Sequence, residues 1–162
     1  MNNIKYIIIL FVCVGLWSCN SKENGTSPFN EFIQNVQNSP VEKRNDLVQN
    51  YLSKIIKTPI IEGNKTVHFI AYLRADSLFI RGDLQNGWAT SHKMAVVNCG
   101  TMNFFYKSYT IQDNSQIEYQ FVLNGETVLD SLNRNIETNF EFGDRNIFQM
   151  PKFVKSPYLD LR

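Results

Sequence analysis

Cysteine, histidine and serine are the residue types of this sequence that could do covalent or metal chemistry. The 162 residues include three cysteines and two histidines. His68 and His92 lie far apart, and no Cys/His group has a spacing that suits a metal ion. A serine nucleophile of the hydrolase kind needs a Gly-x-Ser-x-Gly turn, which the sequence does not contain. We therefore expect no catalytic residue, no metal and no other cofactor in this chain on its own.

The strongest chemical signature is at Cys19, at the end of an apolar run. Lys5 gives the start of the chain one positive charge, and the run YIIILFVCVGL follows it. This run is about half of the roughly 20 residues that a membrane-spanning helix needs, so it is typical of a signal peptide. Its end, Leu16-Trp17-Ser18-Cys19, resembles the lipobox of bacterial lipoproteins. We expect cleavage before Cys19 and a diacylglycerol on its sulfur; the alternative is an uncleaved anchor helix.

A lipid on Cys19 would place the chain in the cell envelope, on the periplasmic or the surface face of the outer membrane. The membrane is then its first partner. Cys13 belongs to the predicted signal peptide and Cys99 is expected to be a small packed residue, so no disulfide is expected in the mature chain. The 16 basic and 15 acidic side chains nearly balance, which gives no electrostatic reason to expect nucleic acid as a partner.

Two helices are predicted to follow the anchor. Ser27-Pro28 is typical of a helix start, because a hydroxyl can cap the first turn and proline fits its first position. Ser39-Pro40-Val41-Glu42 repeats this signal, with the glutamate at the capping-box position. Apolar residues at helical spacing follow both signals, the second stripe as far as Ile56. Thr58-Pro59 is expected to end the second helix.

Strands are predicted for the rest of the chain. They cover residues 67–72, 77–81, 104–110, 117–123, 127–129 and 146–150. The run IEYQFVL ends in Asn124-Gly125, which is typical of a two-residue hairpin turn. Short strands with frequent turn signals favour an antiparallel sandwich, and the lack of strand–helix alternation argues against a parallel sheet. The predicted fold class is mainly β: an antiparallel β-sandwich preceded by two short α-helices.

Several motifs in this segment together resemble a known family. They are Gly82-Asp83 with Trp88, Tyr119-Gln120-Phe121 with Asn124-Gly125, Asp130 with Asn133, and Gly143 with Asn146. Their order and spacing resemble the early-set immunoglobulin-like domain of glycogen-binding modules and of the AMP-activated kinase β subunit. With the helices before it and MPKFVKSPYL after it, the chain is similar to the N-terminal half of secreted bacterial esterases of the enterochelin-esterase type. The resemblance covers about residues 28–158, and in those esterases this sandwich precedes an α/β-hydrolase domain.

This resemblance gives an expected domain organisation. It is a lipoprotein signal peptide over 1–18, a lipid-anchored linker over 19–27, a helical segment over 28–58, an immunoglobulin-like sandwich over 59–155 and a tail over 156–162. The sequence stops at Arg162, where the hydrolase domain of the resembled esterases would begin. We therefore expect an accessory domain without the catalytic one.

The resemblance also implies a sugar-binding site. Glycogen-binding modules stack sugars on two tryptophans, while a lysine and an asparagine add hydrogen bonds. Trp88 matches the first tryptophan and Asn146 the asparagine, whereas Gln120 stands at the lysine position and Thr127 at that of the second tryptophan. Trp88, Gln120 and Asn146 are therefore candidate carbohydrate-binding residues. The alternative is that Trp88 packs at the rim of the sandwich and Asn146 holds a turn.

Three functions remain open at this point. The first is a non-catalytic accessory domain of a secreted esterase-like lipoprotein, standing alone or truncated, with a hydrolase domain as its partner. The second is a free-standing lipoprotein that binds α-glucan. The third is a protein-interaction lipoprotein that docks its partner through aromatic side chains of the predicted strand 104–110, if some of them face outward.

Overall fold

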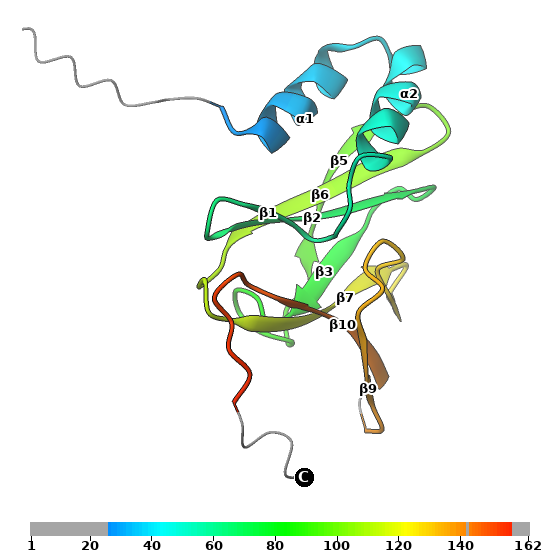
Figure 1. Cartoon of the computed structure of the whole chain (residues 1–162). Coiled ribbons are helices and arrows are strands. Elements are labelled where there is room, and N and C mark those ends of the chain that lie inside the picture. Colours follow the sequence, from blue (N-terminus) through cyan, green and yellow to red (C-terminus); the bar gives the residue numbers. More distant parts are fainter. Residues whose placement is uncertain (1–25, 142, 157–162) are drawn as a thin grey trace, which may run out of the picture.

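Three layers of secondary structure make up the fold (Figure 1). The structure, a computed structural model, describes residues 26–141 and 143–156. Helices α1 (Pro28–Asn38) and α2 (Val41–Leu52) pack on the outer face of a four-stranded antiparallel sheet. A six-stranded antiparallel sheet covers the other face of that sheet. The prediction of a mainly β sandwich preceded by two short helices is confirmed.

The predicted signal peptide over 1–18 and the lipid site at Cys19 lie outside the described residues, as do most of the linker over 19–27 and most of the tail over 156–162. They stay predictions. Within the part of the chain that the structure describes, no helix has the length and apolar character that crossing a membrane requires.

The four-stranded sheet contains the longest pairing of the fold. Its strands are, in spatial order, β1 (Ile60–Glu62), β2 (Thr66–Leu73), β6 (Asn103–Thr110) and β5 (Ala95–Asn98). Strands β2 and β6 pair along their whole length. Phe104 and Tyr106 of β6 face the helices, whereas Phe105 and Tyr109 face the other sheet. Phe104 and Phe105 are buried in these contacts, whereas Tyr106 and Tyr109 are partly buried.

The six-stranded sheet carries the predicted hairpin. Its strands are, in spatial order, β4 (His92–Lys93), β3 (Phe79–Gly82), β7 (Gln116–Leu123), β10 (Gly143–Gln149) and β9 (Ile136–Asn139), with β8 (Glu126–Val128) paired to β7. Asn124 and Gly125 join β7 to β8 with φ angles of 53° and 87°. Both angles lie in the left-handed region that a tight hairpin turn of this kind needs, so this prediction is confirmed.

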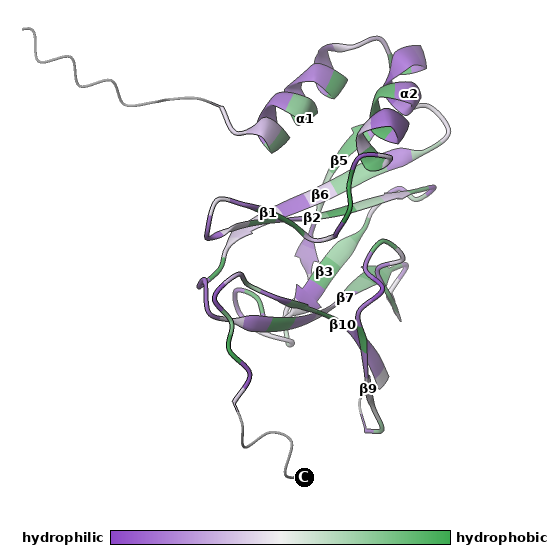
Figure 2. Ribbon diagram, in the orientation of Figure 1, coloured by the Kyte–Doolittle hydropathy of each residue, from purple (hydrophilic) through white to green (hydrophobic). Residues whose placement is uncertain are grey.

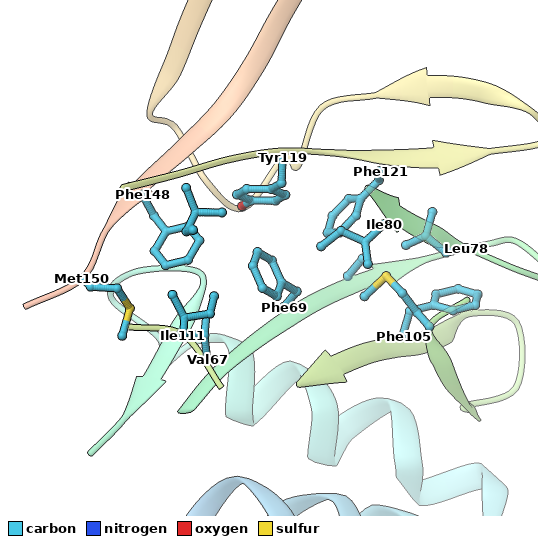
Figure 3. Close-up of a cluster of buried hydrophobic side chains, with 13 residues drawn as sticks. Val67, Phe69, Leu78, Ile80, Phe105, Ile111, Tyr119, Phe121, Phe148 and Met150 are labelled. Atoms are coloured by element: carbon cyan, nitrogen blue, oxygen red, sulfur yellow. The ribbon is translucent and has the colours of Figure 1, made fainter. Parts of the chain in front are cut away.

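Side chains from both sheets fill the space between them (Figure 3). The labelled members are Val67, Phe69, Leu78, Ile80, Phe105, Ile111, Tyr119, Phe121, Phe148 and Met150. Phe69 meets Tyr119 and Phe148 edge-on, with ring centroids 4.8 and 5.6 Å apart. Aromatic pairs favour this arrangement. Successive strand residues alternate between the faces, so the neighbours of these residues point to the outside of the sandwich.

The helices form a second core against the four-stranded sheet. Each helix carries both hydrophilic and hydrophobic residues (Figure 2), and Phe29, Ile33, Val36 and Val48 are the buried ones. The predicted cap of α1 is confirmed, because the Ser27 side chain accepts a hydrogen bond from the third residue of the helix. Cys99 is also packed in this layer, as expected, and burial raises the pKa of its thiol.

The second helix begins where the sequence indicated, but its predicted cap and its predicted end were wrong. No side chain caps the start of α2, because the hydroxyl of Ser39 instead donates to the Asn35 carbonyl at 2.8 Å, at the end of α1. The helix ends at Leu52 rather than near residue 58. The Ile55 amide bonds the Leu52 carbonyl at 3.1 Å, which tightens the last turn. Ile56 is consequently fully exposed, although it had continued the apolar stripe.

Candidate ligand-binding site

The candidate site lies on the outer face of the six-stranded sheet, where three neighbouring strands bring polar side chains together. Arg81 of β3 stands opposite Gln120 of β7, and Arg145 comes from β10 on the other side of β7. Strand alternation turns these side chains away from the core, into which Tyr119 points. Together with Trp88, from the loop after β3, they line a pocket of about 370 Å³.

Two hydrogen bonds fix the amide of Gln120 at the floor of this pocket. Its Nε2 donates to the Asp144 carbonyl at 2.7 Å. Its Oε1 therefore points toward Arg81, whose Nη2 donates to it at 3.3 Å. The Gln120 side chain is 7% exposed, so only a small part of it faces the pocket, and its amide group has a defined orientation.

Trp88 is held in place from two sides. Its indole N–H donates to Asp83 Oδ1 at 2.8 Å, and the other carboxylate oxygen of Asp83 accepts the Glu118 amide at 3.1 Å. The guanidinium carbon of Arg145 lies 4.1 Å from the centroid of the indole, which is a favourable cation–π distance. The aromatic wall of the pocket is thus positioned before any ligand binds.

The two arginines of the pocket differ in how their charge is compensated. Arg145 Nη1 donates to Glu118 Oε2 at 2.7 Å in a partly buried ion pair. Arg81 has no carboxylate at ion-pair distance among the residues described, and its Nε is buried there without a hydrogen-bond partner. Among the described residues, Arg81 is therefore the arginine of this pocket that has no ion pair.

Asn146, the third residue predicted to bind sugar, does not reach this pocket. It is completely buried, and its Oδ1 accepts the Asp130 amide at 2.6 Å. Its Nδ2 donates to the carbonyls of Asn133 and Asp130 at 2.8 and 3.3 Å. The hydroxyl of Tyr119 joins the same network, because it donates to Asp130 and accepts from Asn133. This is the geometry of the alternative interpretation, in which Asn146 holds a turn.

Sequence reasoning therefore brought Trp88 and Gln120 to the site but missed Arg81 and Arg145. The alternation of side chains along a strand could have indicated both arginines. Arg81 is the cross-strand partner of Gln120, and Arg145 directly precedes the inward-facing Asn146, so it must point outward. The family resemblance assigned roles only to the matching positions and gave none to the residues beside them.

A second polar array lies between the four-stranded sheet and α1. His68 Nδ1 is 2.7 Å from Ser108 Oγ, and His68 Nε2 is 3.0 Å from Glu62 Oε2. Cross-strand register places His68 opposite Ser108, and the short β1–β2 hairpin brings Glu62 close to both. Sequence reasoning had assigned His68 to a strand without these partners, although the three residue types are those of an acid–base–nucleophile triad.

This array lacks the shape of a hydrolytic centre. Ser108 lies within the extended strand β6 rather than in a strand-to-helix turn. The Phe29 ring stacks on the imidazole of His68 at a centroid distance of 4.1 Å, and the histidine is 2% exposed. Glu62 Oε1 accepts the Phe29 amide at 2.6 Å. The array therefore fastens the first turn of α1 to the sheet.

Glu62 should make the stability of the protein fall in acid. Partial burial by itself would raise the pKa of this carboxyl, but hydrogen bonds from Ser27, the Phe29 amide and His68 outweigh it, and the pKa is lowered. A lowered folded-state pKa contributes stability above the unfolded-state pKa, and this stability is lost as the pH falls through the folded-state value. We expect the urea midpoint to drop between about pH 6 and pH 3, and to drop less in Glu62→Gln.

Urea unfolding of both proteins across this pH range checks the expectation. Glu126→Gln is the matched control, because it removes an exposed carboxyl on β8. A Glu62→Gln protein that loses as much stability in acid as the unchanged chain would show that Glu62 does not couple α1 to pH.

Other hollows of the surface have less to offer a ligand. One of them, of about 680 Å³, is lined mainly by loop residues near Arg74 and Asn124. Another, of about 540 Å³, lies beside Asp83 and Ser108. In the described ranges no three His, Cys, Asp or Glu side chains are grouped so that they could hold a metal ion. The pocket at Arg81 and Trp88 combines a fixed aromatic ring with a cation that has no ion pair within the described part of the chain.

Comparison with solved structures shows a similar fold in parts of two esterases. No protein-family model matches the chain, and no curated protein matches it. Ferric enterobactin esterase from Salmonella typhimurium is similar in structure, with a TM-score of 0.50 and 12% identity over 69% of this chain and 38% of that one. Enterochelin esterase from Shigella flexneri gives 0.50 and 8% over 69% and 37%. The chain thus spans well under half of these enzymes, and at such identities the likeness shows the fold.

Proposed function

We propose that this β-sandwich is a non-catalytic accessory domain of an esterase-type lipoprotein, where it works beside an α/β-hydrolase domain. The observation that carries the proposal is the likeness of fold to part of two esterases, over 69% of this chain but 38% and 37% of theirs. The resemblance of the sequence to the N-terminal half of such enzymes supports it. The lack of a nucleophile turn in the sequence supports a domain that leaves the chemistry to its partner.

The proposal includes attachment to a membrane in the cell envelope. Cleavage before Cys19 and lipidation of its sulfur would leave only a short polar segment before α1 begins at Pro28. Such a tether would keep the sandwich close to the bilayer. A hydrolase domain beside it would then act at the membrane surface.

Capture of the native protein tests the proposal. An antibody raised against the purified 162-residue chain would be used on detergent-solubilised membranes of the source cells. We expect mass spectrometry to find a diacylglycerol-modified Cys19 at the N-terminus. We also expect a serine hydrolase in the same material, in the same polypeptide or bound to it, identified by fluorophosphonate labelling and by hydrolysis of p-nitrophenyl butyrate. The purified chain alone should neither be labelled nor hydrolyse the ester.

The outcomes separate the parts of the proposal. Ester hydrolysis by the purified chain that disappears in Ser108→Ala would show that the Glu62–His68–Ser108 array is catalytic and overturn the non-catalytic role. Captured material without any labelled hydrolase would overturn the accessory role. An unmodified Cys19 would overturn the membrane anchor and leave the accessory role standing.

The pocket on the six-stranded sheet supports a second candidate function, a free-standing carbohydrate-binding lipoprotein. The specific observation is that Trp88 and Gln120, two of the candidate carbohydrate-binding residues, line the same pocket of about 370 Å³. Titration calorimetry with glycogen, maltoheptaose and β-cyclodextrin tests binding of neutral glucan. The absence of heat with all of them would remove α-glucan as the ligand.

A further inference from the structure

The two arginines of the pocket at Trp88 differ in the part of the chain that the structure describes, because Arg145 has an ion pair and Arg81 has none. Arg145 is neutralised by Glu118 at 2.7 Å. Asp83 has one carboxylate oxygen on the Trp88 indole and the other on a backbone amide, at 2.8 and 3.1 Å. Neither carboxylate forms an ion pair with Arg81, which lies on the strand next to the one that carries Glu118. A carboxylate in the pocket would give Arg81 an ion pair like that of Arg145.

The hydrogen bonds of Arg81 also favour a bound carboxylate. A guanidinium has several N–H donors and no acceptor, but among the described residues only the long 3.3 Å bond to Gln120 engages that of Arg81. Its Nε is buried, so the N–H groups of its terminal nitrogens are the ones that a ligand in the pocket could engage. A planar carboxylate matches the fork of a guanidinium better than a neutral hydroxyl does.

The rest of the pocket suits a ring attached to that carboxylate. Its volume of about 370 Å³ lies in the lower part of the range for small-molecule sites. Trp88 supplies an apolar wall, and Gln120 has an amide whose orientation is already fixed by Asp144. Because these side chains are held before binding, a small ligand would lose little free energy in ordering them.

We propose that this pocket binds a small carboxylate-bearing ring compound, with the carboxylate on Arg81 and the ring beside Trp88. A neutral glucan would leave Arg81 uncompensated, so it binds more weakly. The ring can belong to an acidic sugar or to an aromatic acid, which share this chemistry. The inference does not depend on the accessory role proposed above, and either can fail without the other.

Nuclear magnetic resonance of the full chain tests the proposal through the indole N–H of Trp88, one of two tryptophans in the sequence. The probes are sodium glucuronate, sodium benzoate and maltose, titrated at constant ionic strength. We expect a saturable shift of the Trp88 signal with at least one of the acids and none with maltose over the same range. The acid that binds identifies the source of the ring. Added salt should weaken the binding, because it screens the charge of Arg81.

Arg81→Gln is expected to weaken binding of the acid about tenfold or more, because the charge-assisted hydrogen bonds are lost. Arg74→Gln is the matched control, since it removes the same charge from an exposed side chain outside the pocket. Equal binding by the Arg81→Gln protein would overturn the proposal, as would maltose binding as tightly as the acids or no shift with either acid. If Arg81→Gln fails to fold, the comparison of the two acids with maltose in the unchanged chain still tests whether the pocket prefers a carboxylate.

Discussion

Replacement of Gly82 by alanine is expected to destabilise the protein by about 3 kcal/mol or more. Gly82 ends β3 with a φ of 154°, and an added Cβ would lie 2.7 Å from the Cα of Tyr119 and against the Glu118 carbonyl oxygen. These are backbone atoms of β7, the strand at the centre of the six-stranded sheet. They cannot move aside without disturbing the β3–β7 pairing. Such a loss is a large part of the stability of an ordinary domain.

Urea unfolding measures this effect as a fall of the midpoint at an unchanged slope. Gly63→Ala is the matched control, since Gly63 also has a positive φ, 58°, but no atom lies within 4 Å of an added Cβ. Only backbone strain acts there, and about 1 kcal/mol is expected. Equal losses of stability in the two variants would contradict the prediction, because they would mean that β7 moves aside for the new methyl group at little cost.

The second large effect is expected for Asn146→Ala, with a loss of about 3 kcal/mol. This change leaves the Asp130 amide and the carbonyls of Asp130 and Asn133 without their buried partner. It also opens a hole beside Tyr119, whose hydroxyl contacts the same two residues. Burial raises the pKa of Asp130, which means that its charged form is already destabilised there. The loss of further hydrogen bonds from this network should therefore be costly.

Urea unfolding of Asn146→Ala is compared with that of Gln149→Ala on the same strand. Gln149 is exposed and bonds only the side chain of Gln116, at 2.9 Å, so its removal should cost less than about 1 kcal/mol. A stable Asn146→Ala protein that had lost binding of a sugar would contradict the buried role. It would return Asn146 to the ligand contacts that the family resemblance implied.

The long strands of the fold were predictable, whereas most of the short ones were not. Strands β2, β6 and β7 have eight residues each, rich in β-branched and aromatic side chains, which is enough for the sequence to indicate a strand. Strands β1, β4, β5 and β9 have two to four residues and were missed, because only pairing with a neighbour defines them. The cap of α2 was predicted wrongly because Ser39 lies between the two helices, and its hydroxyl bonds the end of α1 instead.

The site could be predicted only in part, for a different reason. A resemblance can match positions, but it does not say which way a side chain points once neighbouring residues differ. Asn146 matches by position and faces the interior, whereas Arg81 and Arg145 match nothing and face the pocket. Pairing of three strands decides this, and the sequence alone did not show that β3, β7 and β10 are neighbours.

The fastening of α1 also decides where the domain would yield to force. A load applied to the chain before Pro28 first reaches the contact of Phe29 with Glu62 and His68. Glu62 belongs to β1, a three-residue strand at the edge of its sheet, whose few bonds to β2 would open one after another rather than together. If Cys19 attaches the chain to a bilayer as proposed, a pulling force from the membrane would first detach the helices and β1. The six-stranded sheet, which carries the pocket, would stay folded at that stage.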